Sequence, residues 1–241
     1  MNRITRVKIL PGFNTYRDPD ALAMGALFAL GEAQGLIGYP VPALPVGTVL
    51  GLDAPLVVIV GGNGSGKSTR LSKLRARQTF YPALQNTGRN FDFMEVEYSG
   101  ENSPLVFDFE ALHQPSKILT LYHSNGDQAP VERARMSSGQ YQWDCLTAWF
   151  ARIASFDPDY VLTMDQPERD LDILTKPKMI DLVCNHIVRH GHQFIVATHE
   201  ERFLRVHETH GMDALVVSLL ETPARSYRMA EFDLEKYLYS T

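Results

Sequence analysis

The stretch LVVIVGGNGSGKST, residues 56–69, decides the fold class of this chain. Its first five residues are all apolar, which is typical of a strand buried on both faces in a parallel sheet. The residues that follow fit the pattern G-x-x-x-x-G-K-[ST] through Gly61, Gly66, Lys67 and Ser68. A glycine-rich turn between a buried strand and a helix is the arrangement that cradles a phosphate. The sequence therefore predicts an α/β fold with a phosphate-binding loop.

Each residue type in this loop has a physical reason to be there. The glycines let the backbone wrap closely around a phosphate and point N–H groups at it. Lys67 can reach the β- and γ-phosphates, and the hydroxyl of Ser68 can ligate Mg²⁺. We therefore expect ATP and Mg²⁺ as cofactors. The loop residues expected to contact the nucleotide are Asn63, Gly64, Ser65, Gly66, Lys67, Ser68 and Thr69.

Composition is that of a soluble globular domain, with 44% hydrophobic and 21% charged residues in a chain of 241. A net charge of -5 argues against a general nucleic-acid binder, although a local basic patch stays open. Two cysteines cannot build a disulfide framework. The N-terminus has no long apolar run, and glycines and Glu32 interrupt residues 21–38, so we expect neither a signal peptide nor membrane insertion. A cytoplasmic chain with a single domain over residues 1–241 is the simplest expectation.

Strands alternate with helices along the chain, which indicates an α/β fold with a largely parallel sheet. The expected elements are strands at 3–10, 160–164 and 194–198, a pair of strands within 91–109 around the turn 99–104, and helices at 140–156 and 176–190. The first of these helices is amphipathic. Its apolar face consists of Leu146, Trp149, Phe150 and Ile153.

Polar residues follow the two later buried strands. Asp165 ends the strand at 160–164, and His199, 34 residues on (199 − 165), follows the strand at 194–198. Ligands bind at the carboxyl ends of the strands in α/β sheets. We expect Asp165 to hold Mg²⁺ opposite Ser68. For His199, a contact with the γ-phosphate is favoured over an ordinary core or surface histidine.

A second anion site is expected at the segment MSSGQ, residues 136–140. Ser137, Gly139 and Gln140 stand at the start of a helix, where unpaired N–H groups attract anions. The segment alone would also fit a simple helix cap. Because a phosphate-binding loop already serves its own nucleotide, we expect this second site to serve the nucleotide of another subunit.

Taken together, these motifs resemble those of the ABC-type ATPases. Residues 61–69 resemble the Walker A motif, MSSGQ resembles the signature motif with Ser138 in place of its first glycine, and VLTMDQPE resembles Walker B. Residues 169–172 resemble the D-loop, His199 the switch histidine, and Gln114 the Q-loop glutamine, a metal ligand. The resemblance implies an ABC-type head with a mostly parallel core sheet, an N-terminal antiparallel β region and a short helical lobe at about 112–150. It also implies that two copies of the chain enclose two ATP molecules.

The chain is more similar to the soluble branch of this family than to transporter ATPases. Only 23 residues separate Gln114 from Ser137 (137 − 114), where transporter ATPases carry a longer membrane-docking subdomain. The motif DxPE, which ends at Glu168, resembles the corresponding motif of the SMC-like repair ATPases, RecF and the OLD family. The resemblance to this branch implies a protein partner or effector and leaves nucleic acid open as a second kind of partner. The processes that it suggests are DNA maintenance and anti-phage defence.

Gln166 occupies the position of the family's catalytic glutamate. An amide can orient water but is not a useful base, and losing a general base typically slows a reaction by about 10² to 10⁴. ATP binding should survive, because Lys67, Ser68 and Asp165 remain. Two interpretations are open: Gln166 replaces a glutamate in order to trap an ATP-bound state, or it is the native residue of a slow ATPase that uses ATP as a clamp.

Three rival functions and two weaker features complete the sequence interpretation. The rivals are an ATPase subunit of a membrane transporter, a P-loop small-molecule kinase, and a binding-only scaffold. The basic residues after the glycine-rich loop could contact nucleic acid, but a solvated helix face is the favoured interpretation; they are Arg70, Lys73 and Arg77. His186 and His190 suit a helix ending at Gly191 better than a metal site.

Overall fold

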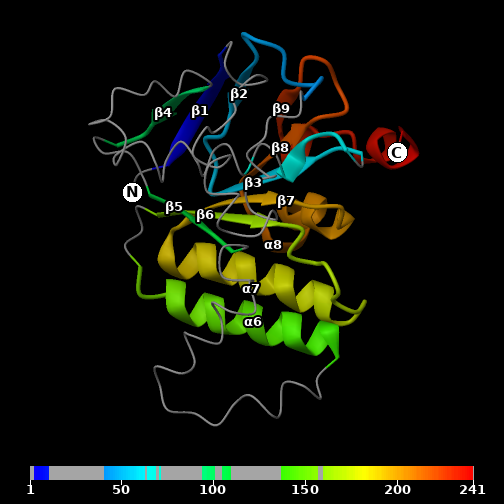
Figure 1. Cartoon of the computed structure of the whole chain (residues 1–241). Coiled ribbons are helices and arrows are strands. Elements are labelled where there is room, and N and C mark those ends of the chain that lie inside the picture. The colour runs from blue at the N-terminus through cyan, green and yellow to red at the C-terminus, as the bar shows by residue number, and fades with distance from the viewer. Residues whose placement is uncertain are drawn as a thin grey trace, which may run out of the picture.

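The computed structural model describes residues 3–10, 41–62, 64–68, 71, 94–100, 105–109, 137–156 and 160–240 (Figure 1). Its larger sheet has six strands in the order β5-β6-β7-β3-β8-β9. These are β3 (Leu56–Val60), β5 (Leu105–Asp108), β6 (Tyr160–Asp165), β7 (Gln193–Ala197), β8 (Ala214–Ser218) and β9 (Arg225–Arg228). All neighbouring strands are parallel except β8 and β9, which are antiparallel. The predicted mostly parallel core sheet is thereby confirmed.

The smaller sheet is antiparallel, with the order β2-β1-β4. Its strands are β1 (Ile4–Ile9), β2 (Val49–Gly51) and β4 (Met94–Tyr98). The expectation that residues 91–109 hold two strands is right, but the idea that they form a pair is wrong. Strand β4 alternates buried and exposed residues and pairs with β1, whereas β5 pairs in parallel with β6. One-sided burial suits an antiparallel sheet that faces solvent.

Three layers enclose two hydrophobic cores (Figure 1). Helices α6 (Ser138–Ile153) and α7 (Thr175–His190) cover one face of the six-stranded sheet, and the three-stranded sheet covers the other. Alternation along β3 supplies both cores: Leu56, Val58 and Val60 pack with the helices, and Val57 and Ile59 with the smaller sheet. The predicted apolar face of α6 is buried. Four short helices that the sequence did not predict flank β8 and β9: η4 (Glu201–Arg205) and α8 (Val206–His210) precede the two strands, and η5 (Met229–Glu231) and α9 (Leu234–Ser240) follow them.

Gln193, the first residue of β7, joins the two sheets. Its side chain is fully buried, and its Nε2 donates to the carbonyl oxygens of Ile4, Leu52 and Ala54 at 3.0, 2.7 and 3.1 Å. Its Oε1 accepts from the backbone N–H of Ile4 at 2.8 Å. A buried amide is tolerated when its donors and acceptor are satisfied in this way. The contact fixes the layers where β7 begins.

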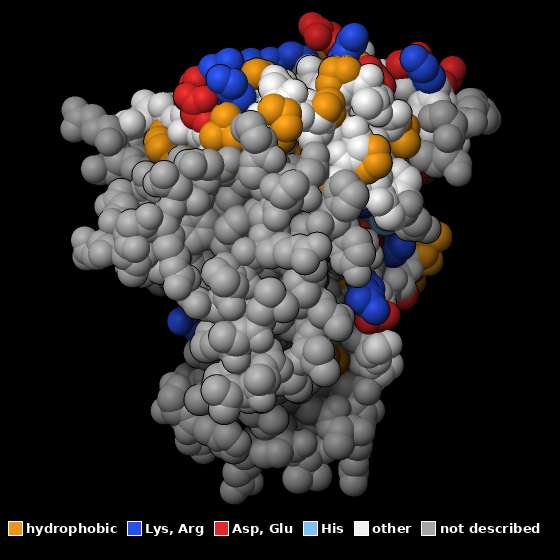
Figure 2. All heavy atoms as spheres, turned by 45° about the horizontal axis from the view of Figure 1, so that its top comes forward, with side chains coloured by type: hydrophobic (Ala, Val, Ile, Leu, Met, Phe, Trp, Pro, Cys, Tyr) orange, Lys and Arg blue, Asp and Glu red, His pale blue; other side chains and the backbone are white. Residues whose placement is uncertain are grey.

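The described surface is charged but balanced. On the exposed side of the smaller sheet, Arg6 pairs with Glu97, and Lys8 lies 3.4 Å from Glu95. Figure 2 shows basic and acidic side chains interspersed in this region, with apolar side chains between them. Within the described ranges, no helix has the length and apolar character needed to cross a bilayer.

Helix α7 ends where the sequence predicts. Gly191 has φ 75° and its N–H donates to the carbonyl of Ile187, which is a left-handed helix cap. Near this helix end, two buried histidines contact each other: Nε2 of His186 lies 2.8 Å from Nδ1 of His192. Burial, and then the neighbouring His190 and His192, lower the pKa of His186 from 6.5 to about 3. His186 is therefore held neutral in the folded protein.

This histidine predicts a pH-dependent stability. Between pH 6.5 and about 3, His186 takes up a proton in the unfolded chain but not in the folded one. Its contribution is thus fully present above pH 6.5 and is lost as pH falls, by up to about 1.4 kcal/mol per pH unit. His186→Gln cannot be protonated and should flatten the dependence of the unfolding free energy on pH between about 4.5 and 6.5. Denaturant unfolding at several pH values measures both slopes, and equal slopes would contradict the assignment.

Candidate functional site

The predicted phosphate-binding loop follows β3, and the helix after it begins at Lys67 as expected. Gly64 and Gly66 have φ values of +75° and +92°, which side chains rarely adopt. A Cβ on Gly66 would lie 2.6 Å from Val41 Cγ1, and a Cβ on Gly61 would lie 2.5 Å from Ser65 Oγ. The loop therefore needs glycine both for backbone conformation and for space.

Lys67 lies inside this loop rather than in solvent. Its side chain is buried, and its Nζ donates to the carbonyl oxygens of Gly61 and Gly62 at 2.8 and 3.1 Å. Burial lowers the pKa of Lys67, while the carboxylates of Asp165 and Glu168 act to raise it. The ammonium group thus faces two carboxylates from the β6 end of the sheet.

Register brings the ends of β3, β7 and β6 to one level. Ile59 pairs with Ala197 on β7, and Ala197 pairs with Asp165 on β6. The next residue, Gln166, has φ +46°, and its N–H donates to the carbonyl of Ala197 at 2.7 Å. Asp165 and Gln166 are therefore fixed at the carboxyl edge beside the loop of Lys67, where the sequence predicted them.

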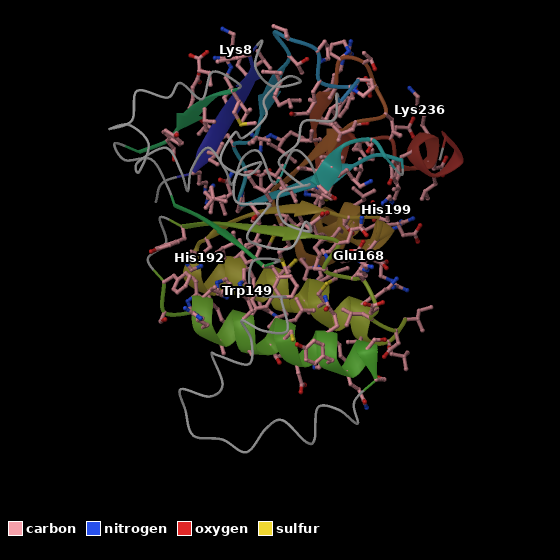
Figure 3. All side chains as sticks on the ribbon, in the orientation of Figure 1. Lys8, Trp149, Glu168, His192, His199 and Lys236 are labelled. Atoms are coloured by element: carbon pink, nitrogen blue, oxygen red, sulfur yellow. The ribbon has the colours of Figure 1, made fainter. Side chains whose placement is uncertain are left out.

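His199 lies at the same edge, after β7, and its side chain is exposed. Its backbone N–H donates to Oε1 of Glu168 at 2.8 Å. Figure 3 shows Glu168 and His199 close together, at the end of the sheet opposite His192. Burial first, and then the charge of Lys67, lower the pKa of His199, against a smaller opposite effect of Glu168. The predicted His199 is therefore brought together with Lys67 and Asp165.

Glu168 is a candidate functional residue that the sequence interpretation missed. The sequence indicated it only as the last residue of the DxPE motif, without a role at the site. In the structure it is 7% exposed and faces the site. Its Oε2 is buried and has no hydrogen-bond partner among the described residues. Nothing in the local pattern QPERD predicts burial of this carboxylate, because it lies in a turn without periodicity.

The signature-like segment and the turn after β6 form one surface within a single chain. Ser137 caps α6: its Oγ accepts from the N–H of Gln140, and the Gln140 side chain accepts from the N–H of Ser137. Gly139 packs against this turn, since a Cβ there would lie 2.7 Å from the carbonyl oxygen of Asp170. Gln142 Nε2 donates to the carbonyl of Pro167 at 3.3 Å. Ser137 and Gln140 thus cap the helix, and both residues are also exposed.

Some predicted site residues lie outside the described residues. These are Asn63, Thr69 and the expected Q-loop residue Gln114. Of the helical lobe at about 112–150, the structure describes only residues 137–150, which are the N-cap and the larger part of α6.

The residues present fit a magnesium-bound nucleotide. Backbone N–H groups of a glycine loop and a buried ammonium group suit phosphate oxygens. Ser65 Oγ is buried in the loop and lacks a hydrogen-bond partner among the described residues, so a polar group is available there. The hydroxyl of Ser68 and the carboxylate of Asp165 are the hard oxygen donors that Mg²⁺ prefers. Among the described residues, at this edge as elsewhere, no cluster of three or more His, Cys, Asp or Glu side chains is placed to hold a metal ion, so the proposed Mg²⁺ would also need oxygens of the nucleotide or water.

The fold has a counterpart among solved structures. The SMC head domain from Thermotoga maritima matches with a TM-score of 0.50 and 14% identity, over 94% of this chain and 98% of that chain. The ATP-binding cassette MJ0796, in a dimeric post-hydrolysis state bound to ADP and Pi, matches with a TM-score of 0.45 and 16% identity, over 78% and 91%. No protein-family model and no curated protein matches this chain. The likeness to the SMC head shows the fold alone, and it confirms the predicted fold of an ABC/SMC-type P-loop head.

The contact of Gly139 with the turn at Asp170 gives a prediction. Gly139→Ala places a Cβ 2.7 Å from a backbone oxygen, so helix or turn must shift. We expect the unfolding free energy to fall by about 1–2 kcal/mol, because overpacking outweighs the helix-propensity gain of alanine. Chemical denaturation measures the change. As the control, Gly51→Ala meets no atom within 4 Å and should be close to neutral; equal effects of the two variants would contradict the close packing.

Proposed function

We propose that this chain is a cytoplasmic ABC-type ATPase head that binds Mg-ATP and closes into a head-to-tail dimer around two ATP molecules. The observation that carries the proposal is the convergence of Lys67, Asp165 and His199 at the carboxyl ends of three adjacent strands. By the family resemblance, closure switches a protein partner or a nucleic-acid process, in DNA maintenance or anti-phage defence.

Each group at this edge has a chemical role in the proposal. The loop N–H groups and Lys67 bind the β- and γ-phosphates, and Ser68 and Asp165 hold Mg²⁺. The metal, when bound, neutralises charge on the phosphate oxygens. His199 is exposed next to this edge and can donate a hydrogen bond to the γ-phosphate. These residues bind and orient ATP, which is most of what phosphoryl-transfer catalysis requires.

A dimer surface is supported by what adjoins the signature-like segment. Ser137 and Gln140 are exposed at the start of α6, directly beside the turn 169–172. Next along the chain, Ile173 and Leu174 are 70% and 76% exposed. Adjacent exposed apolar side chains beside a polar helix start are typical of an interaction site. The proposed partner for this surface is the phosphate-binding loop of a second copy.

ATP should therefore change the oligomeric state. We expect monomers without nucleotide and dimers with Mg-ATP, measured by light scattering during gel filtration. Lys67→Ala removes the ammonium group that meets the phosphates and should abolish the shift. A parent protein that binds ATP yet stays monomeric at saturating concentration would exclude the sandwich dimer while leaving nucleotide binding intact.

Gln166 makes this chain a hydrolysis-deficient Glu-to-Gln form in the proposal. It is half-buried beside Asp165, so its amide replaces a charge close to the γ-phosphate position. Gln166→Glu restores a carboxylate that can act on the attacking water. We expect ATP turnover to rise at least about tenfold, the low end of a general-base effect. Phosphate release measures the change.

The control for this experiment is the double variant Gln166→Glu with Lys67→Ala. It should lose the gained turnover, which separates activity of this chain from that of a contaminating ATPase. Equal ATP turnover of the parent and of Gln166→Glu would contradict the assignment of residue 166 as the catalytic glutamate position.

A further inference from the structure

Glu168 is a buried carboxylate at the proposed ATP site for which the proposed mechanism has no use. Its side chain is 7% exposed, and only its Oε1 has a hydrogen-bond partner among the described residues, the backbone N–H of His199 at 2.8 Å. Burying a carboxylate costs several kcal/mol unless charges and donors compensate. Because a solvent-facing turn residue could avoid that cost, burial of this side chain calls for a specific explanation.

The backbone fixes Glu168 in this inward position from three sides. The N–H of Gln166 donates to β7, the carbonyl of Pro167 accepts from Gln142 on α6, and the carbonyl of Glu168 accepts from the N–H of Leu171 at 3.1 Å. Gln166 and Asp170 adopt left-handed φ values of 46° and 65°, so the turn 166–170 is tightly constrained. Such conformations cost about 1–3 kcal/mol each and persist only where surrounding contacts enforce them.

The other end of the hydrogen bond is the backbone of His199, the residue whose side chain is the proposed γ-phosphate contact. His199 lies in a turn between β7 and η4, and the N–H of Glu200 donates to Oγ1 of Thr198 at 2.9 Å in the same turn. The hydrogen bond from His199 N to Glu168 thus ties the turn after β7 to the turn after β6. Both turns flank Lys67, whose ammonium group interacts favourably with Glu168.

We infer that Glu168 is a positioning residue for His199: its carboxylate holds the backbone N–H of His199 and thereby fixes the imidazole for contact with the γ-phosphate. The inference rests on the proposed function, because it assumes that ATP binds at this edge. Glu168 acts here through His199 and not on the attacking water. An N–H to carboxylate hydrogen bond is about twice as strong as one between neutral groups, which suits it to hold a short turn whose central residue, His199, is exposed.

Two substitutions separate the hydrogen bond from the charge. Glu168→Gln keeps an oxygen that can accept from the His199 N–H, whereas Glu168→Ala removes it. We expect single-turnover ATP hydrolysis, followed over hours with excess protein, to fall about tenfold or more in Glu168→Ala and to stay within about threefold of the parent in Glu168→Gln. ATP affinity should stay within about threefold in both, since Lys67 and Ser68 are unchanged. Glu201→Ala, an exposed carboxylate of the same segment, is the matched control and should keep the parent rate.

A double-mutant cycle tests whether Glu168 acts through His199. Once His199→Ala has removed the imidazole, adding Glu168→Ala should slow hydrolysis by no more than about twofold, because the two residues act as a unit. Hydrogen exchange of the His199 amide, measured without ATP, should speed up in Glu168→Ala but not in Glu168→Gln.

The outcomes distinguish this inference from the proposed function. A parent protein that fails to bind ATP overturns both. If ATP binds, a parent-like rate for Glu168→Ala overturns the positioning role alone. The same holds if Glu168→Gln is as slow as Glu168→Ala, or if the effects of Glu168→Ala and His199→Ala multiply, because the carboxylate would then act directly.

Discussion

Strand β7 is the constraint on which the site depends. All five of its residues are buried, and it pairs in parallel with β3 on one side and β6 on the other. At its start, Gln193 makes two hydrogen bonds with Ile4 of the smaller sheet and two with the connection between β2 and β3. At its end, the carbonyl of Ala197 accepts from Gln166. A shift of β7 by one residue would turn its buried side chains to the wrong faces and separate Lys67 from Asp165.

The carboxyl edge held by β7 is a cluster of compensating charges. Lys67 is buried close to Asp165 and Glu168, so the two carboxylates offset part of the desolvation of the ammonium group, and its pKa still lies below the usual value. The same lysine lowers the pKa of His199. Such a cluster suits the proposed Mg-ATP, because a polyanion and a metal ion would bring charges of both signs into a fixed frame.

Local sequence patterns predicted a large part of this arrangement. The loop at 61–69, the strands that end at Asp165 and Ala197, and the buried face of α6 follow from patterns that span only a few residues. The pairing partners of β4 and β5 could not be predicted in this way, because a turn between two strands does not determine which strands they pair with. Their separation into two sheets was decided by contacts with β1 and β6, which are distant in sequence.

The sequence by itself determined the glycine-rich loop after β3, the α/β class and the position of an amide at residue 166, because glycine freedom, apolar runs and side-chain chemistry are local properties. Tertiary structure alone decided that Glu168 turns inward to His199 and that Gly139 packs on the turn at Asp170. It also decided that Gln193 is buried between the sheets. These three side-chain environments depend on which distant segments meet, and the burial of a polar group is set by the neighbours that satisfy it rather than by its own position in the chain.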